Sequence, residues 1–148
     1  MSIASHHVVI TGEYQHHIII TANDRLRLLQ LLQREFKEIT GCKAHLDDLL
    51  KELHRASIVD PADVPGDVVT MDSVVELTDL DSNDREIYTL VYPDCEDVQE
   101  KMLSVFAPIG TAILGCRVGD IVSWPVPIGE CRMKIENIFY QPEHYEVG

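Results

Sequence analysis

The stretch MLSVFAPIGTAILGCRVGDIVSWPV, residues 102–126, predicts a strand, a short helix and a second strand. Both of its ends carry β-branched and aromatic side chains, which are typical of strands. Between them, Pro108 stands where a helix would begin and Gly115 just past where it would end, an order that suits a short helix. A helix placed in this way would pack on the sheet that the flanking strands join, so the stretch predicts an α+β fold.

Further strands are expected on both sides of this stretch. Four more segments have strand-like composition: DVVTM (67–71), SVVELTDL (73–80), REIYTLVYP (85–93) and CRMKIENIFY (131–140). Turn-forming residues separate the segments, at 81–84, 93–94, 119–120 and 127–129. The pattern predicts a small, strongly twisted antiparallel sheet with one short helix packed on it.

Two amphipathic helices are expected before the sheet. The first, residues 24–39, follows the capping pattern Thr21-Ala-Asn-Asp24 and places its apolar side chains at helical spacing: Leu29, Leu32, Phe36 and Ile39. The second, residues 44–57, carries a similar stripe: Leu46, Leu49, Leu50 and Leu53. Because a loop of only about four residues joins them, we expect an antiparallel hairpin, a short coiled coil about 24 Å long.

The N-terminus repeats one motif, HHVVIT at 6–11 and HHIIIT at 16–21. Neighbouring side chains in a strand point to opposite faces, so each histidine pair offers one imidazole per face, and two ligands do not make a zinc site. We expect no metal here. The second copy is predicted to be the first strand of the fold, and the first copy to pair alongside it, within the protomer or across a homodimer.

Composition and length set broad limits on the protein. The sequence predicts an extension at 1–16, a strand and hairpin at 17–62 and a β-domain at 63–148. Neither a membrane-spanning apolar run nor a signal-peptide pattern is visible, so a cytoplasmic protein without a membrane partner is expected. The four cysteines form no C-x-x-C pair and are expected to be buried or free thiols.

Charge is distributed unevenly along the chain. The net charge is −13, and residues 60–148 carry all of it, with eighteen acids and five bases. Such a field repels phosphate backbones, so no strong direct binding to nucleic acid is expected. A basic protein surface is the more natural partner, although a need for solubility alone also accounts for acidity.

No motif for a catalytic nucleophile or a cofactor is visible, so a protein without enzymatic activity and without a cofactor is expected. The sequence Asp79-x-Asp81-x-Asn83 resembles the start of a calcium loop. However, Asp84 stands where that loop needs glycine and Leu90 where it needs glutamate, so a hairpin turn is expected instead.

Several stretches in this order resemble the Gre-factor superfamily, which includes GreA and GreB, and in particular its short-armed branch. The matching stretches, which cover roughly residues 17–142, are HHIIITANDRLRLLQLL, LHRASIVDPADVPGDVVTMDSVVEL, IYTLVYPD, LSVFAPIGTAILGCRVGD and IENIFYQP. The resemblance implies a coiled-coil hairpin followed by an FKBP-like domain. It also implies binding to bacterial RNA polymerase at the rim of its secondary channel.

The resemblance also implies particular site residues. The family docks partly through the turn before the short helix, which corresponds here to Phe106, Ala107 and Pro108; we expect Pro108 and Ile109 to make contacts, whereas Phe106 could equally belong to the core. The expected hairpin tip comprises Glu38, Thr40, Gly41, Lys43 and Asp47.

Long-armed members hold magnesium at an acidic tip and promote transcript cleavage. The arm here is short and its loop 40–43 carries no acid, so no cleavage activity is expected. Together with the resemblance, this implies a regulator that binds polymerase and competes with Gre factors. Two alternatives stay open. One is a prolyl isomerase, for which Trp124 and Phe139 would be the pocket aromatics, although Trp124 stands in an alternating strand and is predicted to be a core residue. The other is a cleavage factor, which would act through Glu35, Glu38, Asp47 or Asp48.

Overall fold

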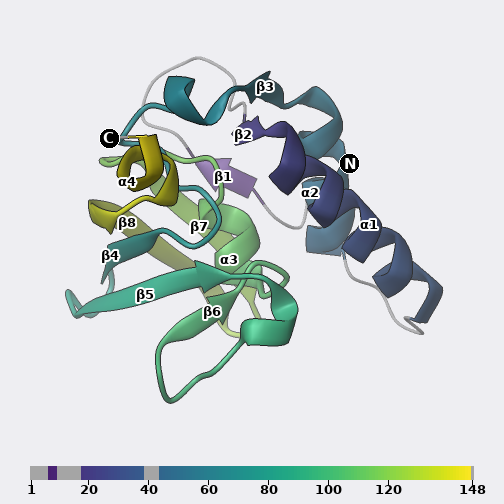
Figure 1. Ribbon diagram of the computed structural model, residues 1–148. Coiled ribbons are helices and arrows are strands. Elements are labelled where there is room, and N and C mark those ends of the chain that lie inside the picture. The colour runs from purple at the N-terminus through teal and green to yellow at the C-terminus, as the bar shows by residue number, and fades with distance from the viewer. Residues whose placement is uncertain (1–6, 10–17, 39–43, 148) are drawn as a thin grey trace.

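The computed structural model describes residues 7–9, 18–38 and 44–147. Figure 1 shows a pair of helices beside a curved sheet, with a short helix packed between them. The helices are α1 (Ala22–Glu38), α2 (Ala44–Arg55), α3 (Pro108–Ile113) and α4 (Pro142–Val147). The strands are β1 (His7–Val9), β2 (Ile19–Thr21), β3 (Ser57–Val59), β4 (Val74–Asp79), β5 (Arg85–Val91), β6 (Met102–Ser104), β7 (Ile121–Val126) and β8 (Gly129–Tyr140). The α+β prediction is therefore confirmed.

The main sheet has six strands in the order β1-β7-β8-β4-β5-β6. Most neighbours are antiparallel, but β5 and β6 run parallel, with Leu90 opposite Leu103. The prediction of a purely antiparallel sheet is therefore wrong. The parallel pair arises because the chain crosses over between β5 and β6 through a 3-10 turn, Pro93–Cys95, and a loop, instead of reversing in a hairpin.

The repeated N-terminal motif divides between two sheets. Its second copy forms β2, which leads directly into α1, as predicted. In the first copy, β1 pairs antiparallel with β7 of the same chain, with Val8 opposite Val122. The prediction that it would lie alongside the second copy is thus wrong for the described residues. The partner of β2 is instead β3, in a small parallel sheet. The predicted second helix, residues 44–57, extends too far, because Ser57 is the first residue of β3.

The segment DVVTM is not a strand, contrary to the prediction. Its backbone makes single contacts instead of a ladder: the Val69 N–H donates to the Cys116 carbonyl, and the Gly115 N–H donates to the Val69 carbonyl. Val68 and Val69 have no exposed surface, so burial accounts for their β-branched character. From the other side the segment is held by Gln141, whose amide donates to the carbonyls of Pro65 and Val68.

One hydrophobic core joins the helices to the sheet. The buried members come from both parts, among them Leu28, Leu32, Leu46, Leu49, Leu53, Val75, Leu77, Leu90, Ile113, Trp124 and Ile135. The prediction that Trp124 is a core residue is confirmed. The buried face of α2 contributes Leu46, Leu49 and Leu53, and that helix packs against both α1 and α3. No helix in the described ranges is long and apolar enough to cross a membrane.

Candidate functional site

The predicted docking turn lies between β6 and α3. Hydrogen bonds fix its shape: the Phe106 N–H donates to Ser104 Oγ at 3.0 Å, and Thr111 Oγ1 donates to the Val105 carbonyl at 2.7 Å. Pro108 occupies the first position of α3, where a helix needs no N–H donor. The backbone of the turn is thus fixed by contacts within the fold.

The four residues of the docking turn differ in exposure. Pro108 is exposed, whereas Phe106, Ala107 and Ile109 are partly buried. Phe106 and Ile109 pack against the core with part of their surface and leave the rest accessible. The turn thus presents a small apolar surface with Pro108 as its most accessible member.

The structure describes only the first and the last residue of the predicted hairpin tip. Glu38 is the last residue of α1, and Asp47 is exposed in the first turn of α2. Thr40, Gly41 and Lys43 lie outside the described residues. The four acids considered for cleavage chemistry therefore lie on α1 (Glu35, Glu38) and on α2 (Asp47, Asp48).

The start of α2 lies against the docking turn. His45 Nε2 is 2.9 Å from the carbonyl oxygen of Phe106, a hydrogen bond between residues 61 positions apart. Sequence reasoning missed His45 because no local pattern links it to the turn. The contact makes the beginning of α2 and the residues 106–109 one continuous surface, with Asp47 close to it in sequence.

The start of α1 is joined to the β-domain by a polar contact. The Tyr92 hydroxyl donates to Asp24 Oδ1 at 2.6 Å, and the guanidinium of Arg27 lies 3.7 Å from the centre of the Tyr92 ring. Burial raises the pKa of the Tyr92 hydroxyl, and the hydrogen bond to Asp24 and its charge raise it further. Nearby, desolvation and the charge of Asp24 raise the pKa of Asp72.

Replacing Tyr92 with phenylalanine is expected to lower the free energy of unfolding by about 1–3 kcal/mol, because a hydrogen bond to a carboxylate is lost. The folded protein holds the phenol proton more tightly than the unfolded chain. This contribution is therefore complete below about pH 10 and declines as the pH rises further. Urea unfolding of both proteins at pH 8 and pH 10.5 measures the difference, which should shrink at the higher pH.

The matched control is Tyr88→Phe, whose ring lies 5.4 Å from Lys101 Nζ and which leaves the Asp24 contact intact. A loss of stability for Tyr92→Phe no larger than that of this control would contradict the assignment.

The structure offers little support for other chemistry. Within the described residues, no cluster of three or more histidine, cysteine, aspartate or glutamate side chains could hold a metal. The backbone N–H groups of Asp81 and Ser82 donate to Asp79 Oδ1, so the segment compared with a calcium loop is a turn. Trp124 is buried in the core whereas Phe139 is 57% exposed, so the two aromatics do not line one pocket. Cys95, Cys116 and Cys131 are free thiols, and Cys42 lies outside the described residues.

Comparisons with known proteins agree on one family. Residues 64–140 match the sequence model described as "Transcription elongation factor, GreA/GreB, C-term". The "Regulator of nucleoside diphosphate kinase" of Escherichia coli K12 is 42% identical over 98 residues, which are 66% of this chain and 72% of that protein. The "Transcription elongation factor GreA" of Prosthecochloris aestuarii is 42% identical over 94 residues, 62% of this chain and 59% of that protein.

A solved structure extends the likeness beyond the matched domain. A "Prokaryotic transcription elongation factor GreA/GreB from Nitrosomonas europaea" superposes with a TM-score of 0.70 and 38% sequence identity. The alignment covers 85% of this chain and all of that one. It therefore includes helices as well as the sheet.

Proposed function

Because this chain belongs to the GreA/GreB family of transcription elongation factors, we propose that it binds bacterial RNA polymerase as a regulator without enzymatic activity of its own. The binding site would be the rim of the secondary channel, in the cytoplasm, where the protein would compete with Gre factors. The single observation that carries the proposal is the docking turn, which is held by hydrogen bonds and exposes Pro108.

Charge supports a protein partner on the docking side. Residues 60–148, which contain the docking turn, carry all of the net charge of −13. A surface with this field is attracted to basic protein surfaces, and such attraction raises the rate of encounter. We therefore expect a basic partner surface around an apolar contact at Pro108 and Ile109.

We interpret α1 and α2 as the short antiparallel hairpin of the family and the β-domain as its FKBP-like part. Arg25 Nε, near the start of α1, donates to the carbonyl of Leu53, near the end of α2, at 2.9 Å, as antiparallel neighbours would. The helices have 17 and 12 residues, or about 25 Å and about 18 Å.

Transcript cleavage is not part of the proposal. The hydrogen bond of His45 keeps the first turn of α2 beside the docking turn, so Asp47, although it belongs to the predicted hairpin tip, lies close to the docking surface. An acid held there would not extend from the docking surface into a deep catalytic centre. The same packing supports a role in occupying the channel entrance.

A competition experiment tests the proposal. Core RNA polymerase carrying fluorescently labelled GreA should release it as this protein is added at low salt, and the displacement should weaken as salt rises. The control is bovine serum albumin, an acidic protein without this fold, which should not displace the labelled GreA. Absence of binding to the polymerase at low salt would overturn the proposal.

The same samples separate the alternatives. Incubation of backtracked complexes with this protein and magnesium should release no short RNAs, and a protease-coupled assay on an X-Pro peptide should match buffer. Activity in either assay would replace the regulator by the corresponding enzyme or cleavage factor.

A homodimer through the N-terminal strand would use the outer side of β1, because its inner side pairs with β7.

A further inference from the structure

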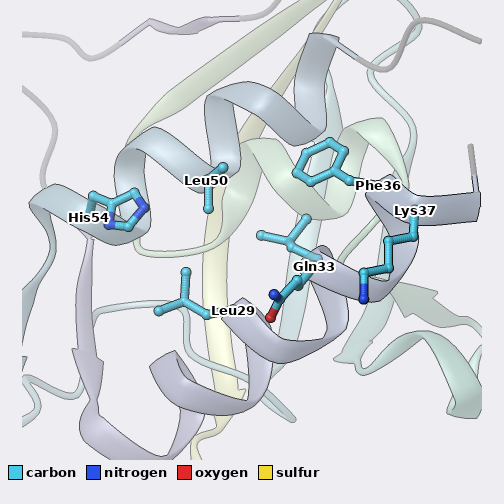
Figure 2. Close-up of a pocket in the computed structure, with 7 residues that line it drawn as sticks. Leu29, Gln33, Phe36, Lys37, Leu50 and His54 are labelled. Atoms are coloured by element: carbon cyan, nitrogen blue, oxygen red, sulfur yellow. The ribbon is translucent and has the colours of Figure 1, made fainter.

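An apolar groove runs between α1 and α2. Its lining comprises Leu29, Leu32, Gln33, Phe36 and Lys37 from α1, with Leu50 and His54 from α2. The groove has a volume of about 550 Å³, large enough for several side chains. Figure 2 shows Leu29, Leu50 and Phe36 directed into the space between the two helices.

The groove is apolar along its floor and open at its rim. Leu29, Phe36 and Leu50 are only partly buried, although each also packs against the core. Gln33, Lys37 and His54 are exposed. Part of the apolar surface of three large side chains thus remains in contact with water, which favours binding of another apolar surface.

The polar side chains lie at opposite ends of the groove. Figure 2 shows His54 beside Leu29 and Leu50 at one end, and Lys37 beyond Phe36 at the other. The α1 residues from Leu29 to Lys37 rise by about 12 Å, or two turns of helix. Two turns are also the span of a helical stripe with apolar residues at i, i+4 and i+7.

The charge of the lining residues favours an acidic helix over a basic one as the binding partner. The seven lining residues include one lysine, one histidine and no carboxylate, in a chain of net charge −13. An occupant with carboxylates beside its apolar stripe would meet Lys37 at one end and the His54 imidazole at the other. A basic amphipathic helix would instead meet the like charge of Lys37 and gain no compensating acid from the lining.

We propose that this groove is a binding site for a partner protein, which inserts an amphipathic helix of two to three turns with acidic residues flanking its apolar stripe. The site is separate from the docking turn, because its lining residues are at positions 29–37, 50 and 54. The protein would thus hold an acidic helical partner on its arm, whatever its β-domain binds.

The test uses the full chain alone and two helical peptides of about 15 residues. Both carry leucines at i, i+4 and i+7, flanked by glutamates in one peptide and by lysines in the other. Fluorescence anisotropy should show the acidic peptide binding with a dissociation constant below about 100 μM, and the basic peptide binding at least about tenfold more weakly.

Two variants at exposed lining positions, with a third outside the lining as control, test whether the peptide binds in the groove. Lys37→Glu should weaken binding of the acidic peptide about fivefold or more, because attraction becomes repulsion. Lys51→Glu makes the same charge change on α2 outside the lining and should alter binding by about twofold or less. Gln33→Trp should fill the groove and weaken binding about tenfold or more. Circular dichroism shows that each variant is folded.

Three results would overturn the proposal. One is no binding of the acidic peptide at 100 μM protein; another is equal loss for Lys37→Glu and Lys51→Glu. The third is self-association of the unmodified chain in sedimentation velocity that Gln33→Trp abolishes, since a second copy would then be the occupant. None of these measurements involves polymerase, so they can fail while the proposed function stands.

Discussion

Replacing Gly110 with alanine is expected to lower the free energy of unfolding by about 2–4 kcal/mol, because the added methyl group has no room. A Cβ at this position would lie 2.1 Å from the carbonyl oxygen of Ser104 and 2.9 Å from its carbonyl carbon. These atoms belong to the backbone of β6, and the same oxygen accepts the N–H of Ala107. Relief of the clash therefore requires α3 and the docking turn to separate from the strand.

Urea unfolding followed by circular dichroism measures this loss, with Gly66→Ala as the matched control. A Cβ at Gly66 would lie 3.0 Å from Cε1 of His144, an exposed side chain whose displacement costs at most its hydrogen bond with the Val64 carbonyl. We expect this control to change stability by about 1 kcal/mol or less. Similar losses of unfolding free energy for the two alanine variants would show that the close approach of α3 to β6 does not make Gly110 necessary for stability.

Replacing Pro108 with aspartate is expected to weaken binding to RNA polymerase at least about tenfold, since a charge would enter the centre of a small apolar contact. The position is exposed, and an acid in the first turn of a helix is favourable, so the fold should be unaffected. The measurement is the competition with labelled GreA, together with a thermal unfolding curve for the variant.

The control for this variant is Ile128→Asp, which makes the same change of charge at an apolar side chain that is 96% exposed, in the β7–β8 turn. Because both variants add one negative charge, any general effect of charge on polymerase binding is shared. Equal affinities for the two variants would mean that the turn before α3 is not the docking site, even if the protein binds polymerase.

Local patterns in the sequence were sufficient to predict most of the helices and strands. The segment from β4 to β8 contains β-branched runs separated by turn formers, and α3 is bounded by Pro108 and Gly115, as expected. α1 and α2 follow their leucine stripes. These signals depend on neighbouring residues, which is why they can be read without knowing the tertiary packing.

Errors arose where tertiary contacts determine the local structure. The β-branched residues Val68 and Val69 indicated a strand, but their burial under Gln141 and beside Cys116 explains them equally well. The parallel pairing of β5 with β6 and of β2 with β3 depends on how the connections cross in space. The helix α4 was missed, although it begins at Pro142 as α3 begins at Pro108, because the residues after Pro142 were not read as a helix.

The beginning of α3 at Pro108 was predicted from a local signal. The assignment of the turn before it as a docking site came from the resemblance to the Gre-factor superfamily and stays a prediction. His45 and Tyr92 could not be found, because each acts through a partner far away in the sequence, Phe106 and Asp24. The groove was also not recognised, since Leu29, Phe36 and Leu50 satisfy a core pattern and differ from core residues only in remaining partly exposed.

The bond between His45 and Phe106 also bears on how arms of different length can evolve on one scaffold. It attaches α2 at its second residue, so among the described residues the contacts of α2 with the rest of the fold begin at that point and continue toward its C-terminal end. Extra helical turns inserted between Glu38 and Ala44 would therefore leave the attachment unchanged. Arm length is then a freely adjustable trait, and a lineage could gain or lose reach by insertion or deletion without rebuilding its anchor.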